Sequence, residues 1–276
     1  MRNPKISIIT VVFNSEATIV DTIESVRAQN YPNMEYIVVD GLSKDRTLDR
    51  IHEHGDVITR LVSEKDFGIY DAMNKGIRLA TGEVIGFING DDFYMPGVLA
   101  KVAEAFLDPA LDACYGDLCY VRQNDISTVV RHWRSSPFVP GAFEEGWCPP
   151  HPTFFVRREV YERYGLFDLD YRIAADVELM MRFLERHYIN SNYLPGVMVT
   201  MRLGGTTNRS WENILQQNKE VLHALKIHGL RANPVRFFSK KLLSAVVNTV
   251  LFRDGFGYQS TVMSLALTAV CGDFFG

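Results

Sequence analysis

Short β-branched runs alternate with segments of helical periodicity over the first 110 residues, and this alternation is the strongest constraint on the fold. The runs are apolar on both faces, and the segments between them carry apolar residues three and four positions apart. Such strands and amphipathic helices form parallel sheets with right-handed crossovers. We expect strands at residues 6–13, 36–39, 57–62 and 84–88. The chain is therefore predicted to be an α/β protein whose mostly parallel sheet is flanked by helices.

The second half of the chain is less regular and ends in helices. We expect strands at 114–121, 129–133, 153–156 and 197–201, a loop at 137–152, a helix at 176–186 and a flexible connector at 202–208. From Trp211 the pattern is helical, and Asn233-Pro234 is typical of a helix start. The residues expected to share one helical face are Trp211, Ile214, Leu215, Val221, Leu222 and Leu225. We predict a main domain at 1–208 and a helical C-terminal extension at 209–276.

Composition excludes several classes of protein. The 29 Lys and Arg residues against 33 Asp and Glu give a net charge of −4, so the chain has no domain-wide basic field for nucleic acid. The four cysteines form no C-x-x-C pair, which favours a reducing compartment. No apolar run approaches the roughly 18 residues that cross a bilayer. We expect a cytoplasmic protein, with the inner face of the membrane as the alternative location.

Carboxylates follow two of the expected strands, at the sheet edge where α/β proteins bind ligands. Asp40 ends one strand, and the adjacent pair Asp91-Asp92 follows another. Adjacent aspartates repel each other unless a cation or hydrogen-bond donors intervene. Mg²⁺ and Mn²⁺ bind such carboxylates together with phosphate oxygens, and a cation of this kind stabilises a departing diphosphate. The alternative is a turn that caps the next helix, because Asn, Gly and Asp are ordinary turn residues.

Four motifs at successive strand ends resemble the family 2 inverting glycosyltransferases with the GT-A fold. The resemblance spans roughly residues 5 to 205 and is greatest to enzymes that extend bacterial surface polysaccharides such as O-antigen. No glycine-rich dinucleotide loop or P-loop is present. The motifs are SIITVVFN (7–14), VDGLSKDRT (39–47), SEKDFGIYDAMNKG (63–76) and NGDD (89–92).

The resemblance implies roles for the donor-side residues. Asp40 would accept a hydrogen bond from the nucleotide base, in a pocket also shaped by Thr10, Phe13 and Glu16. The alternative for Asp40 is a turn cap through Ser43 and Asp45.

Diphosphate and metal contacts follow from the same resemblance. Asp91 would bind the ribose hydroxyls, and Asp92 would ligate Mn²⁺ or Mg²⁺. Lys65 and Lys75 could face phosphate, although lysines are usually solvated surface residues. His151, beside the long loop, would ligate the metal or contact the diphosphate, and a structural histidine is the alternative.

An inverting transfer needs one carboxylate to take the proton of the acceptor hydroxyl. The resemblance places this base at Asp176. Here the chain departs from the commoner Glu-Asp pair, because Ala175 precedes the aspartate. The alternative is an N-cap for the helix that follows. Trp147 could stack on a sugar ring, or it packs against the core.

The tail carries basic and aromatic residues around an apolar face, from Arg231 to Arg253. This composition suits an interfacial helix on anionic lipid, where a lipid-linked acceptor would reside. The alternative is a helical hairpin packed on the domain or on a second copy of the chain in a homo-oligomer.

These observations together predict a metal-dependent inverting glycosyltransferase. It would move a sugar from a nucleoside diphosphate, with UDP as the expected nucleotide, to a hydroxyl of a glycan or lipid-linked acceptor. One alternative is a catalytically inactive nucleotide-sugar-binding or scaffold protein. Another is a sugar-1-phosphate nucleotidyltransferase, which is disfavoured because the first strand is not followed by a Gly-rich basic loop.

Overall fold

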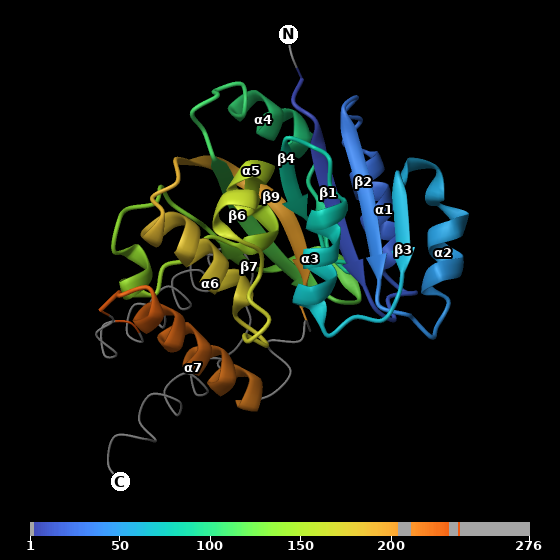
Figure 1. The fold of residues 1–276 in the computed structure, drawn as a ribbon. Coiled ribbons are helices and arrows are strands. Elements are labelled where there is room, and N and C mark those ends of the chain that lie inside the picture. Colours follow the sequence, from blue (N-terminus) through green and yellow to red (C-terminus); the bar gives the residue numbers. More distant parts are fainter. Residues whose placement is uncertain (1–2, 204–210, 232–236, 238–276) are drawn as a thin grey trace.

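The computed structural model describes residues 3–203, 211–231 and 237. It contains one mixed sheet of nine strands in the order β3-β2-β1-β4-β8-β6-β9-β5, with β7 paired to β6 (Figure 1). The strands are β1 (Ile6–Val12), β2 (Met34–Asp40), β3 (Arg60–Ser63), β4 (Val84–Phe87), β5 (Phe93–Tyr94), β6 (Ala113–Arg122), β7 (Asp125–Trp133), β8 (Phe155–Arg157) and β9 (Ser191–Arg202).

The first four strands form the parallel part of the sheet. β1 pairs in parallel with β2 and β4, and β2 pairs in parallel with β3. The register places Val12 opposite Asp40, and Asp40 opposite Ser63. The carboxyl ends of these strands therefore meet at one edge, as the alternating pattern predicts.

The second half of the sheet is mixed. β8 runs antiparallel to both β4 and β6, whereas β9 runs parallel to β6. β9 begins six residues before its expected start, and a register shift between Tyr115 and Asp117 accommodates Pro195 and Gly196. The two-residue strand β5 was not expected, and it pairs with the far end of β9.

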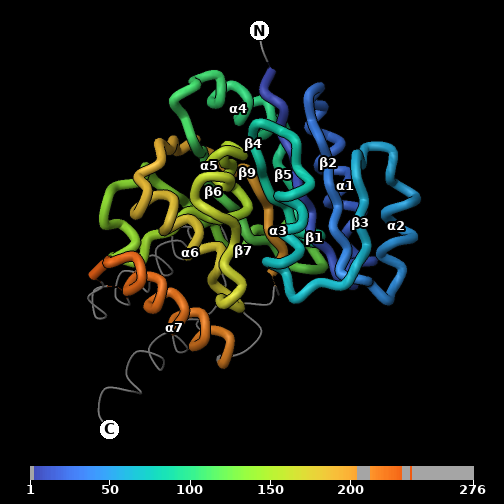
Figure 2. The backbone as a smooth tube through the Cα atoms, viewed as in Figure 1, coloured from blue at the N-terminus to red at the C-terminus, as the bar shows by residue number. Residues whose placement is uncertain are grey.

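Helices cover both faces of the sheet (Figures 1 and 2). One face packs against apolar residues of α1, α2 and α4, and the other against α3, α5, α6 and α7. The α-helices are α1 (Ile19–Arg27), α2 (Thr47–Glu53), α3 (Ile69–Leu79), α4 (Val98–Ala105), α5 (Arg158–Tyr164), α6 (Ala175–Met181) and α7 (Trp211–Ile227).

Three element boundaries differ from the sequence prediction for local reasons. Residues Gly55–Val57 form a 3-10 turn, so β3 starts at Arg60 rather than at residue 57. His151–Thr153 also forms a 3-10 turn, because the Thr153 hydroxyl bonds the carbonyls of Pro150 and Gly116. The helix that was expected to reach residue 186 changes to a π-helical turn at Arg182–Arg186. The long loop contains a 3-10 turn at Ala142–Glu145.

The C-terminal helix α7 packs beside α6 (Figure 1). Val221, Ala224 and Leu225 are buried in the same apolar cluster as α3 and α6. Leu215, which was expected on the same helical face as Val221 and Leu225, is 54% exposed, so it does not join them in the core. The expected connector beyond Leu203, the Asn233-Pro234 helix start and the basic tail residues after Arg231 lie outside the described residues. No helix in the described ranges combines the length and apolar character of a membrane span.

Candidate functional site

The loops after β1 and β2 are tied together by hydrogen bonds at the sheet edge. The Asn14 amide donates to the Ser43 hydroxyl, and the Lys44 amide donates to the Asn14 side chain, both at 2.8 Å. The Glu16 carboxylate accepts the Arg46 amide at 2.9 Å. Asn14 and Leu42 adopt left-handed backbone angles, with φ of 51° and 61°. For a residue such as Leu42 this conformation costs about 1–2 kcal/mol, whereas asparagine adopts it more readily, so the paired loop is held in a specific shape.

Asp40 is fully buried beneath this loop pair. Its carboxylate accepts hydrogen bonds from the Ser43 amide and hydroxyl, and from the Ser63 hydroxyl at 2.6 Å. The turn cap through Ser43 that we considered is therefore present, whereas Asp45 bonds Thr47 and Glu16 instead. A carboxylate offers about four lone-pair sites. Contact of Asp40 with a nucleotide base stays a prediction.

The other expected base-pocket residues differ in exposure. Thr10 is buried and shares a 3.1 Å hydrogen bond with the Tyr36 hydroxyl. Phe13, at the end of β1, is 57% exposed, which leaves its ring available for stacking on a planar group. Glu16 is exposed and ties the loops together through Arg46.

The acidic pair lies in a turn between β4 and β5. The Asp92 amide donates to the Asn89 carbonyl at 3.1 Å, which closes the turn. A β-carbon on Gly90 would lie 2.6 Å from a Val12 methyl group, so only glycine fits here. Helix α4 begins after Gly97 with no side-chain cap, so the alternative in which the pair caps the next helix is wrong.

Arg202, at the end of β9, stabilises this turn through hydrogen bonds. Its backbone amide donates to Asp92 Oδ1 at 3.2 Å, and its guanidinium bonds the Asp91 carbonyl at 2.7 Å. The same guanidinium pairs with Asp21 and lies over the Phe93 ring. The sequence prediction missed Arg202, because only the sheet pairing brings β9 to this turn.

Asp92 has the surroundings expected of a carboxylate that binds a cation. It is fully buried, and burial together with the charge of Asp91 raises its pKa well above the ordinary value. Asn89 Nδ2 donates to Oδ2 at 3.1 Å and the Arg202 amide to Oδ1, which leaves further lone pairs on both oxygens. In the described part of the chain, no three His, Cys, Asp or Glu side chains converge as a metal cage. Mg²⁺ requires only one or two protein carboxylates, so Asp92 fits it.

The two lysines of the third motif occupy different positions. The Lys65 side chain is exposed. The Lys75 ammonium bonds the Lys65 carbonyl at 2.6 Å and pairs with Glu64 at 3.0 Å, and it lies 3.6 Å from Asp71. Lys75 therefore stabilises the start of α3, and a phosphate contact by Lys65 stays a prediction.

Asp176 is the second residue of α6 and is half-buried. Its Oδ1 accepts the Val177 amide at 2.9 Å and the Tyr70 hydroxyl at 3.1 Å. The N-cap alternative is wrong, because the cap position is Ala174. Among the described residues no donor bonds Asp176 Oδ2, so this oxygen can accept a proton from a ligand.

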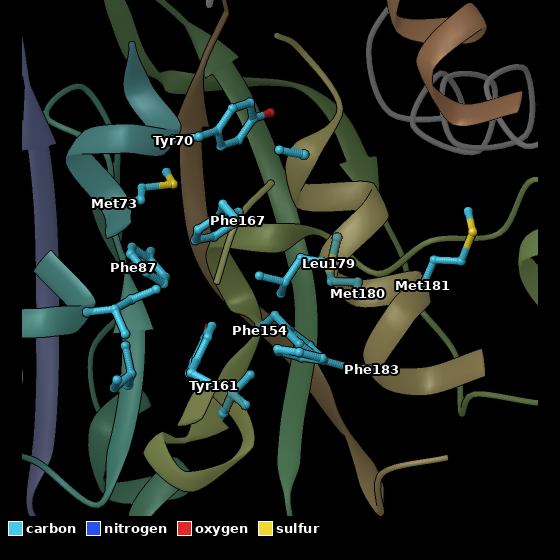
Figure 3. Packing of buried hydrophobic residues seen from close by; sticks show 14 of the residues in the cluster. Tyr70, Met73, Phe87, Phe154, Tyr161, Phe167, Leu179, Met180, Met181 and Phe183 are labelled. Carbon is cyan, nitrogen blue, oxygen red and sulfur yellow. The ribbon is translucent and has the colours of Figure 1, made fainter. Parts of the chain in front are cut away.

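Tyr70 connects Asp176 to the third motif. Its hydroxyl also bonds the Ile173 carbonyl at 2.7 Å. Burial raises the pKa of Tyr70 well above its ordinary value, and the charge of Asp176 adds to this shift. The hydroxyl therefore stays protonated and donates. In Figure 3 the Tyr70 ring extends from α3, next to Phe167, whose ring it stacks on at 5.6 Å.

His151 lies beneath this cluster, with its ring 5.4 Å from those of both Phe87 and Phe167. Its Nε2 is buried and has no hydrogen-bond partner among the described residues. Burial lowers the pKa of His151, while the charge of Asp176 opposes that shift. A neutral imidazole with an unpaired nitrogen suits either role that we expected, metal ligand or diphosphate contact.

Tyr120, on β6, lies within electrostatic reach of both Asp92 and Asp176. Burial raises its pKa, Arg131 opposes the shift, and both carboxylates add to it. The Arg131 guanidinium lies over the Tyr120 and Trp133 rings, with centroid distances of 5.4 and 5.7 Å. The structure thus brings the acidic turn and Asp176 to the same region of the molecule.

Trp147 packs against aromatic side chains rather than standing free in the loop. Its ring lies 5.5 Å from Phe143, 5.8 Å from Phe138 and 5.9 Å from Tyr115. Its indole nitrogen donates to Ser136. The core-packing alternative for Trp147 is therefore the one observed.

Comparison with known proteins identifies relatives over most of the chain. The model of the family named "Glycosyl transferase family 2" matches residues 7–165. A PGL/p-HBAD biosynthesis glycosyltransferase from Mycobacterium bovis is 32% identical over 216 residues, which cover 75% of this chain and 81% of the relative.

Two solved structures share the fold. One is the mannosyltransferase PcManGT from Pyrobaculum calidifontis in complex with GDP-Man and Mn²⁺, with a TM-score of 0.60 and 20% identity; the match covers 100% of this chain and 82% of that one. The other is S. aureus TarS 1-349 in complex with UDP-GlcNAc, with a TM-score of 0.59 and 18% identity. That match covers 98% of this chain and 80% of TarS 1-349.

Proposed function

The chain belongs to glycosyl transferase family 2 and has the predicted GT-A fold, and from this premise we propose an inverting, metal-dependent mechanism for it. The donor is a nucleoside-diphosphate sugar, with UDP as the expected nucleotide. The acceptor is a hydroxyl of a glycan or lipid-linked acceptor in surface polysaccharide synthesis. The PcManGT complex with GDP-Man and Mn²⁺ and the TarS complex with UDP-GlcNAc support a nucleotide-sugar donor, and the former supports a divalent ion.

The observation that carries this proposal is the hydrogen bond from Tyr70 to Asp176, which spans 106 residues. It joins the motif helix of the donor side to the candidate base. A carboxylate is thereby fixed close to the expected donor site, and its Oδ2 remains open. The charges of Asp92 and Asp176 both raise the pKa of Tyr120, which supports a short separation between the two carboxylates.

The donor side holds the nucleotide in this proposal. Phe13 stacks on the base, and Asp40, Thr10 and Glu16 shape its pocket. Asp91 binds the ribose, and Lys65 lies near phosphate. Asp92 would hold Mn²⁺ or Mg²⁺, with His151 as the second candidate ligand, and a bound ion would stabilise negative charge on the departing diphosphate.

The transfer itself requires one base. The acceptor oxygen forms a bond to the anomeric carbon on the face opposite the diphosphate, the bond from that carbon to the phosphate oxygen breaks, and Asp176 Oδ2 takes the hydroxyl proton. Tyr70 and the Val177 amide hold Oδ1, which fixes the direction of Oδ2. Because a single displacement occurs, the anomeric configuration inverts.

An assay of nucleoside diphosphate release tests the reaction. The protein is incubated with a panel of nucleotide sugars, an acceptor hydroxyl compound and Mn²⁺ or EDTA, and the product configuration is read by NMR. We expect release that EDTA abolishes and an inverted product. Retained configuration or metal-independent release would contradict the mechanism, pyrophosphate formation would indicate a nucleotidyltransferase, and absence of turnover with every donor would favour the scaffold alternative.

We also propose that the C-terminal extension contacts anionic membrane, as its basic and aromatic composition suggests. Packing against a second copy is the alternative. A chain truncated after Phe237 keeps α7 and tests this contact through liposome sedimentation and size-exclusion chromatography. Unchanged binding to anionic vesicles would contradict the membrane contact, and loss of a dimer on truncation would favour self-association.

A further inference from the structure

The segment that leads into Asp176 is held by a carboxylate from the C-terminal helix. Glu220, on α7, is buried, with 7% of its surface exposed. Its Oε1 accepts the Arg172 amide at 3.1 Å, and its Oε2 accepts the Ile173 and Ala174 amides, each at 2.9 Å. One side chain thus satisfies three successive backbone donors directly ahead of α6.

We infer that Glu220 is a positioning residue for transfer, because it fixes the backbone from which Asp176 projects. The inference rests on the proposed role of Asp176 as the base. It extends the functional unit from α6 to α7, and both helices lie beyond residue 165, where the family match ends. It also separates two properties of the protein: turnover should depend on Glu220, and donor binding should not.

The same segment is held from its other side by Tyr70. The Ile173 amide donates to Glu220, and the Ile173 carbonyl accepts the Tyr70 hydroxyl at 2.7 Å. Tyr70 contacts Asp176 itself, whereas Glu220 acts two to four residues earlier in the chain. The base is therefore placed by a clamp between α3 of the donor side and α7 of the extension.

The charge of Glu220 strengthens the clamp. Burial would raise its pKa, but hydrogen bonds from Gln216 and from the amides of residues 172–174 lower it below the ordinary value. The carboxylate is therefore ionised at neutral pH, and hydrogen bonds to a charged acceptor are roughly twice as strong as neutral ones. Its charge also contributes to the raised pKa of Tyr70, so Glu220 lies within electrostatic reach of the tyrosine that bonds the candidate base.

A second contact fixes α7 against α6. His228, just after α7, bonds Glu178 of α6 through Nε2 at 2.8 Å, and Arg182 bonds the same carboxylate at 3.0 Å. The helix is thus anchored at two points, so Glu220 can hold residues 172–174 at a defined distance. A displacement of about 1 Å in a catalytic group can cost about 100-fold in rate.

The experiment compares Glu220→Gln with Glu212→Gln, an exposed carboxylate on the same helix. We expect Glu220→Gln to lower kcat at least about tenfold, because an amide offers one poor acceptor to three backbone donors. Donor Kd by calorimetry should stay within about twofold, and amide exchange at residues 172–174 should become faster. Glu212→Gln should leave all three measurements within about twofold of the wild type.

Gln216→Ala is a milder variant for the case in which Glu220→Gln does not fold. It removes only the 2.8 Å bond to Glu220 Oε1, and we expect a fall in kcat of about twofold to threefold at unchanged donor Kd. Wild-type kcat in either folded variant would overturn the inference, as would a loss of donor affinity that parallels the loss of kcat.

Asp176→Asn, measured in parallel, separates this inference from the proposed function. If Asp176→Asn is inactive and Glu220→Gln is fully active, only the positioning role of Glu220 is wrong. If Asp176→Asn transfers sugar at the wild-type rate, the base assignment is wrong, and the inference about Glu220 fails with it.

Discussion

The donor-side loops after β1 and β2 hold themselves in place, whereas the segment that carries Asp176 is held by distant elements. Ser43 bonds Asp40 three residues away, and the two loops bond each other across about 30 residues. Asp176 depends instead on Tyr70, 106 residues earlier, and residues 172–174 ahead of it depend on Glu220, 46 to 48 residues later. Donor binding and proton transfer should therefore respond to different mutations.

The largest effect on stability should come from Leu225→Ala. Leu225 is 1% exposed and packs in the cluster that also contains α3 and α6. Loss of a buried leucine side chain costs about 2–5 kcal/mol. Urea unfolding should show that loss in a single transition, with Leu215→Ala, on the exposed face, within about 0.5 kcal/mol of the wild type. A separate transition for α7 would mean that the extension folds independently of the site.

Asp92→Asn should weaken donor binding where Asp176→Asn does not. Removal of a carboxylate from the proposed metal site should raise the donor Kd at least about 100-fold in Mn²⁺, which corresponds to about 2.7 kcal/mol. Calorimetry with and without EDTA measures this. If Asp92→Asn and the wild type bound the donor with equal affinity in Mn²⁺, Asp92 would not hold the ion.

Glu35 provides a carboxylate of purely structural role on the donor side. It lies at the amino end of β2 and accepts bonds from Ser7, Lys5 and both the amide and hydroxyl of Thr81. Glu35→Gln should cost about 1–3 kcal/mol of stability at pH 7 and leave kcat and donor Kd unchanged. A large fall in kcat in a fully folded Glu35→Gln protein would show that the hydrogen bonds of Glu35 influence the candidate site.

The same carboxylate predicts a pH dependence. Burial opposes ionisation of Glu35, but its hydrogen bonds prevail and lower the pKa from 4.5 to about 2. A carboxyl with a lowered pKa in the folded state stabilises the protein above its unfolded pKa. The difference in unfolding free energy between wild type and Glu35→Gln should thus be constant above about pH 5 and shrink as the pH falls toward 2. A difference independent of pH would contradict this shift.

Tyr70→Phe should have the smallest effect in this series. We expect kcat to fall about tenfold, which corresponds to about 1.4 kcal/mol. The change removes the donor to Asp176 and to the Ile173 carbonyl and leaves the ring stacked on Phe167. Donor Kd should be unchanged. Equal kcat in the variant would indicate that Glu220 alone fixes the segment.

The sequence predicted the positions of the donor-side candidates well, because these residues lie at the ends of the strands that carry them. Their contacts with a donor stay predictions. Asp40 and the Asp91-Asp92 turn follow strands whose pairing depends on local alternation of apolar runs. The long loop and the helix after Ala174 were also expected. The starts of β3 and β8 were misplaced, because the 3-10 turns at Gly55–Val57 and His151–Thr153 take up the first residue of each expected strand.

The long-range contacts that hold Asp92 and Asp176 could not be predicted to the same depth. Arg202 reaches Asp92 because it is the last residue of β9, whose carboxyl end pairs with β5, a strand of only two residues. Tyr70 and Glu220 meet at residues 172–174 through tertiary packing alone. The sequence around Tyr70 and the sequence around Glu220 give no local signal of such contacts.

The most direct test of the account is a paired measurement on Asp176→Asn. Transfer rate and donor Kd are determined on the same preparation, in Mn²⁺, with thermal unfolding as the check on folding. We predict a rate at least about 100-fold below the wild type, in the range typical of a lost general base, with donor Kd within about twofold. A folded Asp176→Asn protein that transfers sugar at the wild-type rate would contradict it.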